Sequence, residues 1–284
     1  MTPEQIARLP RPLAFVLPGG GALGTYQVGV LKALTEAGVT PDLLVGVSAG
    51  AVNSVLFAWN GGLDGVARLE TMWRNIKRRD LMRLEVGRMA MGLMGRHPSF
   101  LDSMHGHRFL THQLGARLLE HAPTRVAVVA TDLSSGEGVA LTTGDAARAV
   151  LASTAFPGVF PPVHIDGRTF VDGGVVADVP LELTLQLGAA SALVLCVPSL
   201  AAGPVPKHAL DILFRASSLG VEAHGRTVLR RPPPGLEVVE IVAPTSDVTT
   251  FDVGKSVGMI EVGHQHTATW LAALDVERED RAGA

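Results

Sequence analysis

A serine flanked by glycines, in "GVSAG" (46–50), is the residue of this sequence best suited to nucleophilic chemistry. The spacing matches G-x-S-x-G, in which the serine occupies a sharp turn between a strand and a helix. An apolar run (42–47) leads into Ser48, and an apolar helical pattern (49–59) follows it. Side chains at the two flanking positions would collide across such a turn, which explains Gly46 and Gly50. The sequence predicts a nucleophile elbow, the alternative being a serine in an ordinary tight turn.

Four glycines follow another apolar run near the N-terminus, in "FVLPGGGALG" (15–24). Three of them fit G-x-G-x-x-G, but a dinucleotide site needs a carboxylate at the end of the second strand to hold the ribose. Asp42 stands at the start of that strand, and Ser48 follows its end. We therefore interpret the loop as an oxyanion hole, in which backbone N–H groups face a developing negative charge. The residues expected to form it are Gly19, Gly20, Gly21 and Ala22.

A serine hydroxyl is a poor nucleophile unless a neighbouring base takes its proton. In "FVDGG" (170–174), Asp172 ends a predicted strand beside two glycines, which let its carboxylate approach another loop closely. Partial desolvation would raise its pKa from the ordinary value of about 4 and make it a better base. Three other acids compete for this role. Asp132 has the sequence context of a turn organised by Asx hydrogen bonds, and Asp166 and Asp178 have loop contexts typical of solvated side chains.

Histidine offers a different base, because the chain order would permit a triad of Ser48, Asp172 and either His264 or His266. The elbow of an α/β-hydrolase usually follows several strands, however, and Ser48 follows only two. The remaining candidates for metal ligands, His105, His107 and His112, come without the carboxylates typical of a metal site. The sequence therefore predicts no metal and no cofactor.

The elements around these motifs alternate between strands and helices at the start of the chain, which predicts a parallel sheet with right-handed crossovers. Apolar runs predict strands at 13–17, 42–47, 125–133, 139–143, 168–174, 191–198 and 236–244. Helical patterns fall at 25–38, 49–59, 145–156, 207–230 and 256–274. We expect one domain over 1–284, with a frayed tail at 275–284.

With its glycine-rich loop, G-x-S-x-G and a distal "DGG" (172–174) in this order, the sequence resembles the patatin-like phospholipase family. The resemblance extends from about residue 13 to 200 and includes "ASTAFPGVFPPV" before "FVDGG". It implies a three-layer α/β/α fold with a mostly parallel sheet and a Ser48–Asp172 dyad without histidine. Two positions depart from the family pattern: Leu23 replaces an Arg or Lys, and Asp178 stands where Asn is frequent.

The resemblance implies an enzyme that cleaves lipid acyl esters, of phospholipase A or lysophospholipase type. Two alternatives remain: a soluble carboxylesterase or thioesterase with the same dyad, and a catalytically silent lipid-binding protein. The net charge of −3, without a basic stripe, argues against nucleic acid as a partner. The single cysteine, Cys196, lies in a predicted buried strand and excludes a disulfide framework.

The segment 72–112 interrupts the alternation of strands and helices and is rich in Met, Leu and Arg. From Arg74 to Arg96, both included, the segment has seven basic and two acidic residues. Methionine adapts to irregular apolar surfaces, and arginine can meet lipid headgroups. This pattern is equally typical of a lid or lipid-contact region and of a solvated helix that covers the core. The N-terminus has no apolar signal region, and no apolar stretch of about 18 residues occurs, so we expect a cytoplasmic protein with peripheral membrane contact.

Overall fold

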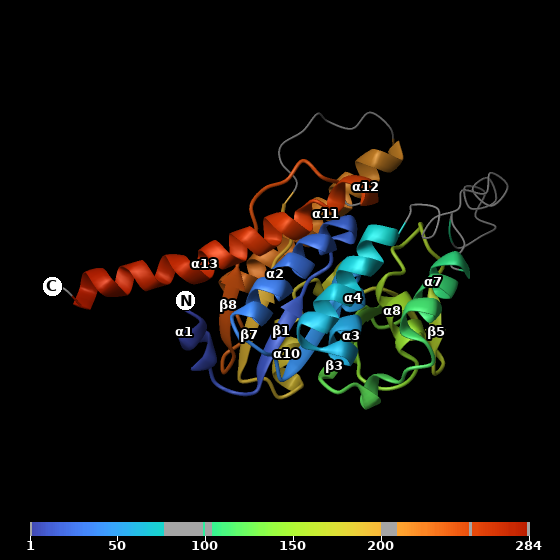
Figure 1. Cartoon of the computed structure of the whole chain (residues 1–284). Coiled ribbons are helices and arrows are strands. Elements are labelled where there is room, and N and C mark those ends of the chain that lie inside the picture. Colours follow the sequence, from blue (N-terminus) through green and yellow to red (C-terminus); the bar gives the residue numbers. More distant parts are fainter. Residues whose placement is uncertain (1, 77–98, 100–103, 200–208, 250–251, 283–284) are drawn as a thin grey trace.

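The structure is a computed structural model, and it describes residues 2–76, 99, 104–199, 209–249 and 252–282. Within these ranges a single sheet of eight strands forms the centre of the molecule (Figure 1). The strand order is β5-β6-β3-β2-β1-β7-β8, and β4 pairs with β3 beside this path. The strands are β1 (Leu13–Leu17), β2 (Leu43–Val47), β3 (Arg125–Asp132), β4 (Gly138–Leu141), β5 (Val163–Ile165), β6 (Arg168–Asp172), β7 (Ser191–Leu195) and β8 (Glu237–Ile241).

Five neighbouring strands, β3-β2-β1-β7-β8, run parallel, whereas β4, β5 and β6 pair antiparallel. The predicted strands at 125–133 and 139–143 form the antiparallel pair β3 and β4, with Val128 opposite Leu141. The short strand β5 was not predicted, because three residues are too few to show an alternating pattern. The mostly parallel sheet agrees with the fold class expected from the sequence.

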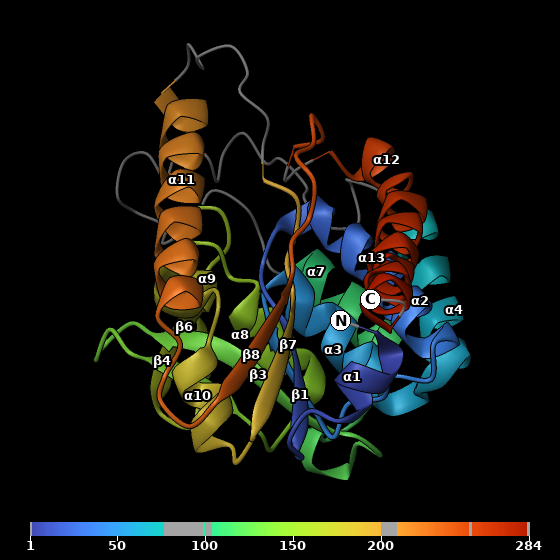
Figure 2. The ribbon, with the colours of Figure 1, turned by 90° about the vertical axis from the view of Figure 1, so that its left-hand side faces the viewer.

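Helices cover both faces of the sheet, as Figure 2 shows. One face carries α1 (Pro3–Ala7), α2 (Gly24–Glu36), α3 (Ala49–Asn60), α4 (Gly62–Asn75), α7 (Met104–Leu114), α8 (Ala146–Ser153), α12 (Val253–Ser256) and α13 (Met259–Ala282). The other face carries α9 (Gly174–Ala177), α10 (Leu181–Gln186) and α11 (Ala209–Arg230). Two short 3-10 helices, η1 (Gly21–Leu23) and η2 (Leu119–His121), complete the described elements. This three-layer arrangement confirms the predicted α/β/α fold.

Side chains of each central strand alternate between the two layers, which is why both faces need a helical cover. On β1, Leu13, Phe15 and Leu17 belong to the apolar cluster that includes α2 and α3. Ala14 and Val16 point the other way, into the cluster that includes Leu181 of α10. None of these five side chains is more than 1% exposed, so the strand is buried on both sides. The uninterrupted apolar run of the sequence reflects this double burial.

Helix α13 packs along α2 through two glycines that let the backbones approach closely. A Cβ on Gly29 would lie 1.9 Å from the carbonyl oxygen of Ile260, and one on Gly263 would lie 2.2 Å from that of Tyr26. The Tyr26 hydroxyl shares a hydrogen bond of 2.7 Å with His266 Nδ1. The contact holds α2 in place, and α2 begins where the glycine-rich loop ends.

Helix α13 continues to Ala282, whereas the sequence pattern predicted its end at residue 274. Residues 275–282 include the good helix formers Glu, Arg and Ala and contain neither Gly nor Pro, so no residue there ends the helix. None of the helices in the described ranges is long and apolar enough to cross a bilayer. Most of the segment 72–112, including Arg78, Arg79 and Arg83, lies outside the described residues, so the lid remains a prediction.

Candidate active site

Ser48 occupies the turn between β2 and α3 in a conformation that non-glycine residues rarely adopt, with φ 52° and ψ −120°. Neighbouring glycines make this turn possible. A Cβ on Gly46 would lie 2.5 Å from the carbonyl oxygen of Gly50, and one on Gly50 would lie 2.0 Å from that of Leu17. A side chain at either glycine would therefore collide with the backbone, as the sequence pattern implied. Local strain of this kind persists only where the surrounding structure enforces it, and it is common at functional sites.

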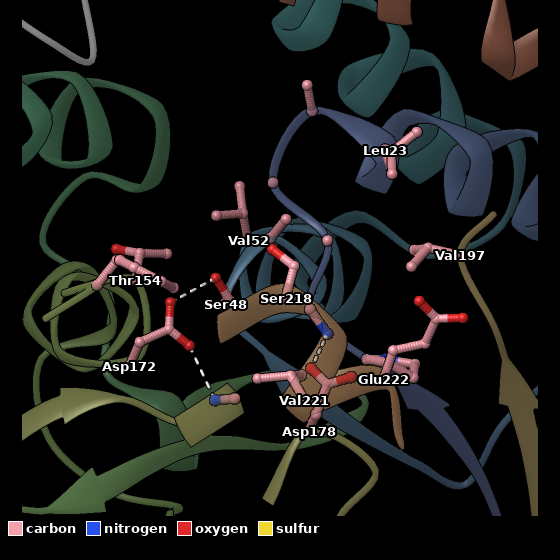
Figure 3. Close-up of a pocket in the computed structure, with 18 of the residues that line it drawn as sticks. Leu23, Ser48, Val52, Thr154, Asp172, Asp178, Val197, Ser218, Val221 and Glu222 are labelled. Atoms are coloured by element: carbon pink, nitrogen blue, oxygen red, sulfur yellow. Dashed lines mark hydrogen bonds between the residues drawn. The ribbon is translucent and has the colours of Figure 1, made fainter. Parts of the chain in front are cut away.

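The Ser48 hydroxyl donates a hydrogen bond of 2.8 Å to Asp172 Oδ2 (Figure 3). The register of β3 brings the two residues together, because Val129 pairs with Val47 and the next residue, Ala130, pairs with Asp172. The second carboxylate oxygen of Asp172 accepts the N–H of Gly174 at 2.8 Å.

Asp172 is only 5% exposed, and its environment disfavours a negative charge. Burial raises the pKa of its carboxyl group to about 7, and the nearby Asp178 adds to the rise. The hydrogen bonds from Gly174 and Ser48 act in the opposite direction, since they stabilise the charged form. A carboxyl group with a pKa near neutrality can both accept and return a proton at physiological pH.

Ser153, at the end of α8, holds the backbone of the elbow. Its Oγ accepts the N–H of Ser48 at 2.8 Å and donates to the carbonyl oxygen of Val129 at 2.6 Å. Ser153 is fully buried, so both bonds are shielded from water. Sequence reasoning did not single out this residue. Its signal was present in the segment "ASTAFPG", which the resemblance had included.

The glycine-rich loop is fixed at both ends by side chains from other elements. Gln27 donates to the carbonyl oxygen of Pro18 at 2.9 Å, and Asn53 donates to that of Gly24 at 2.8 Å. Asn53 also donates to Gln27 and accepts from the indole N–H of Trp73, so the clamp is one buried network. A clamped loop keeps its amides in one orientation.

The four predicted oxyanion residues do not have equivalent amides. The N–H of Gly19 donates to Asp178 Oδ1 at 2.9 Å and is therefore already occupied. The N–H of Gly20 has no acceptor among the described residues. Gly21 and Ala22 begin the helical turn η1, where the first amides lack partners within the helix. The free N–H donors of the glycine-rich loop are therefore those of residues 20–22.

A cavity of about 980 Å³ opens above Ser48 and Asp172 at the carboxyl ends of the parallel strands. In open α/β sheets this edge is the usual place for a ligand. Much of the wall is apolar and comes from α4, α7 and α8 and the segment after α8: Met72, Trp73, Ile76, Phe109, Leu110, Leu151, Phe156 and Phe160. The opposite wall is more polar and contains Glu222 and Arg226 of α11, Cys196, which follows β7, and Glu240 of β8. The cavity can thus accept a long apolar chain on one side of Ser48 and polar groups on the other.

The rejected acids and histidines lie elsewhere, with one exception. Asp132 accepts the N–H of Ser134 and pairs with Arg168, in agreement with its predicted turn role. Asp166 is exposed. His264 pairs with Glu36 at 2.6 Å, and His266 contacts Tyr26, so both face α2.

The exception is Asp178, for which the expectation of a solvated side chain was wrong. It lines the cavity and bonds to the glycine-rich loop, a contact between distant segments that its loop context could not reveal. Cys196 is less buried than its predicted strand implied, since it is partly exposed and lines the cavity. Burial and the nearby Glu240 raise the pKa of its thiol, which keeps it protonated.

The sequence profile of the family described as patatin-like phospholipase matches residues 15–185, which contain the elbow, the glycine-rich loop and Asp172. The chain belongs to the patatin-like phospholipase family. Among the relatives of this patatin-like chain, an uncharacterised NTE family protein of Mycobacterium tuberculosis is 32% identical over 175 residues, covering 61% of this chain and 28% of the relative. The lysophospholipase NTE1 of Phaeosphaeria nodorum is 27% identical over 179 residues, covering 63% of this chain and 11% of that protein.

The patatin-like chain thus spans less than a third of the length of either relative. Among solved structures, VipD from Legionella pneumophila superposes with a TM-score of 0.51 at 13% identity, covering 93% of this chain and 67% of that one. This likeness shows a shared fold.

Proposed function

We propose that this patatin-like chain is a lipid acyl hydrolase, with Ser48 as nucleophile and Asp172 as general base. The observation that carries the proposal is the 2.8 Å hydrogen bond between the two side chains at the floor of the cavity. A further support is the name of its relative, a lysophospholipase. We also propose that the chain acts as one domain, because every residue of the site lies on or beside the single sheet.

In the first half of the reaction, Asp172 takes the hydroxyl proton of Ser48 while the oxygen attacks the carbonyl carbon of the ester. The carbonyl oxygen becomes negatively charged, and the free amides of Gly20, Gly21 and Ala22 stabilise it. The tetrahedral intermediate collapses when Asp172 returns the proton to the departing alcohol. The acyl group then remains on Ser48 as an ester.

In the second half, water attacks the acyl-serine while Asp172 accepts a proton from it. Collapse of this intermediate returns the proton to Ser48 and releases the fatty acid. One carboxyl group therefore serves as base and acid in turn, which its pKa of about 7 suits. The apolar wall around Trp73 and Phe109 is where we place the acyl chain.

The test is labelling with a fluorophosphonate probe followed by a panel of ester substrates. An active hydrolase is labelled at Ser48, and Ser48→Ala abolishes labelling. A silent lipid-binding protein would not be labelled at all, which would overturn the proposal.

Comparison of long-chain lysophospholipid and diacyl phospholipid vesicles with short p-nitrophenyl esters then separates a lipid hydrolase from a carboxylesterase. Hydrolysis restricted to short, water-soluble esters would contradict the assignment of lipid as the substrate.

A further inference from the structure

Asp178 is a second acid at the site, half-buried in the cavity wall, and the proposed reaction does not use it directly. It follows α9, and its Oδ1 accepts the N–H of Gly19, the first peptide of the glycine-rich loop, at 2.9 Å. Figure 3 shows it below the loop, beside Val221 of α11. A Cβ on Gly19 would lie 2.8 Å from the same oxygen, so the loop backbone rests directly on this carboxyl group.

The carboxyl groups of Asp178 and Asp172 both lie close to Gly174. A Cβ on Gly174 would lie 3.2 Å from Asp172 Oδ1 and 3.3 Å from Asp178 Oδ1. Two carboxyl groups this close repel each other when both are ionised. Burial raises the pKa of Asp178 to about 6, and its negative charge contributes to the raised pKa of Asp172.

Apart from Asp172 and Asp178, the charged groups of the cavity wall balance in number, with Glu222 and Glu240 against Arg215 and Arg226. The thiol of Cys196, after β7, donates to Glu240 of β8 at 3.4 Å. On α11, Arg226 is paired with Glu222. Arg215 is the other described cation of the cavity wall. Leu23 adds no positive charge, although the family pattern has Arg or Lys at this position.

We propose that Asp178 is a positioning residue that acts twice: it anchors the glycine-rich loop through Gly19, and it acts on Asp172 as a neighbouring negative charge. The second action keeps a proton on Asp172 to higher pH and so makes it a stronger base. The proposal rests on the proposed function for its catalytic consequence, whereas the interaction between the two carboxyl groups exists without it.

The experiment compares the intact chain with Asp178→Asn, which keeps an oxygen able to accept the N–H of Gly19 but removes the charge. Carbon-13 NMR of labelled Asp carboxyl groups gives the titration midpoint of Asp172, assigned with Asp172→Asn. We expect this midpoint to fall by about one pH unit in Asp178→Asn. Asp166→Asn, the same change at an exposed turn, is the matched control and should leave it unchanged.

Asp178 ionises before Asp172, so the charge interaction appears in the midpoint of Asp172, and Asp178→Ser, another neutral replacement, answers the question if Asp178→Asn fails to fold. An unchanged Asp172 midpoint in both Asp178 variants would overturn the proposal, whether or not the protein hydrolyses esters.

If hydrolysis is present, the acidic limb of the kcat/KM profile should move to lower pH in Asp178→Asn by the same amount. A lower rate with an unmoved limb would reduce Asp178 to a structural anchor and contradict its electrostatic role. Absence of hydrolysis in every variant, with coupled midpoints, would instead count against the proposed function alone.

Discussion

Ser48 and Asp172 lie 124 positions apart in the chain, yet one hydrogen bond of 2.8 Å joins their side chains. The contact depends on β3, which pairs in parallel with the strand before Ser48 and antiparallel with the strand that ends in Asp172. Strand β6 runs antiparallel to β3, and its last residue, Asp172, therefore lies beside the turn that carries Ser48.

Replacement of either member of the pair should abolish ester hydrolysis while the protein remains folded. In Ser48→Ala the nucleophile is lost, and in Asp172→Asn the base is lost, so kcat/KM should fall by about 10³-fold or more in each. Because the two residues act together, the double variant should be no slower than either single one. Ser54→Ala is the matched control, since the Ser54 hydroxyl is buried on α3 and has no hydrogen-bond partner among the described residues. Substantial activity in Asp172→Asn would assign the base to another residue.

Ser153→Ala should slow catalysis although Ser153 does not touch the reacting atoms. The N–H of Ser48 would lose its acceptor and the elbow its support, so we expect kcat to fall by roughly 10-fold to 100-fold. A buried donor left without a partner should also lower the free energy of unfolding by about 1–3 kcal/mol. Turnover and urea unfolding measure the two effects. Wild-type kcat in a folded Ser153→Ala protein would show that the turn at Ser48 keeps its conformation without Ser153.

Gly50→Ala should destabilise the fold strongly, because the added Cβ would lie 2.0 Å from the carbonyl oxygen of Leu17. Backbone on both sides cannot move away cheaply, so the free energy of unfolding should fall by about 3 kcal/mol or more. Gly220→Ala, in α11, is the control: outside the helix's own backbone, no described atom lies within 4 Å of its Cβ position, and helix propensity favours alanine by about 0.5–1 kcal/mol. Equal melting temperatures of the two variants would be incompatible with the close packing of the elbow.

Stability should fall with rising pH because of Asp172. Its pKa is raised to about 7 in the folded chain, whereas it is about 4 when unfolded, so the folded state holds the proton more tightly. This contribution is fully present below about pH 4 and is lost as the pH rises through 7. Asp172→Asn removes the ionisation and should therefore be more stable than wild type at pH 8, by an amount on the order of 1–3 kcal/mol, with no difference near pH 4. Urea unfolding at both pH values measures this difference in stability. An Asp172→Asn protein less stable than wild type at pH 8 would contradict the claim that the buried charge of Asp172 destabilises the fold.

The sequence by itself determined the parts of this site that are local. The spacing of Gly46, Ser48 and Gly50 predicted the elbow, and apolar runs and turn residues predicted the central strands within a few positions. These features could be read because a strand, a tight turn or a helix start depends on neighbours only a few residues away.

Only the tertiary structure decided which distant groups meet. It placed Asp178 on the amide of Gly19, 159 positions away, and Ser153 on the amide of Ser48, 105 positions away. It also turned His264 and His266 toward α2. No local pattern encodes such contacts, because they result from the register of β3 and from the packing of helices on both faces of the sheet. The identity of each polar side chain is written in the sequence, but its partner is fixed only when the strands pair.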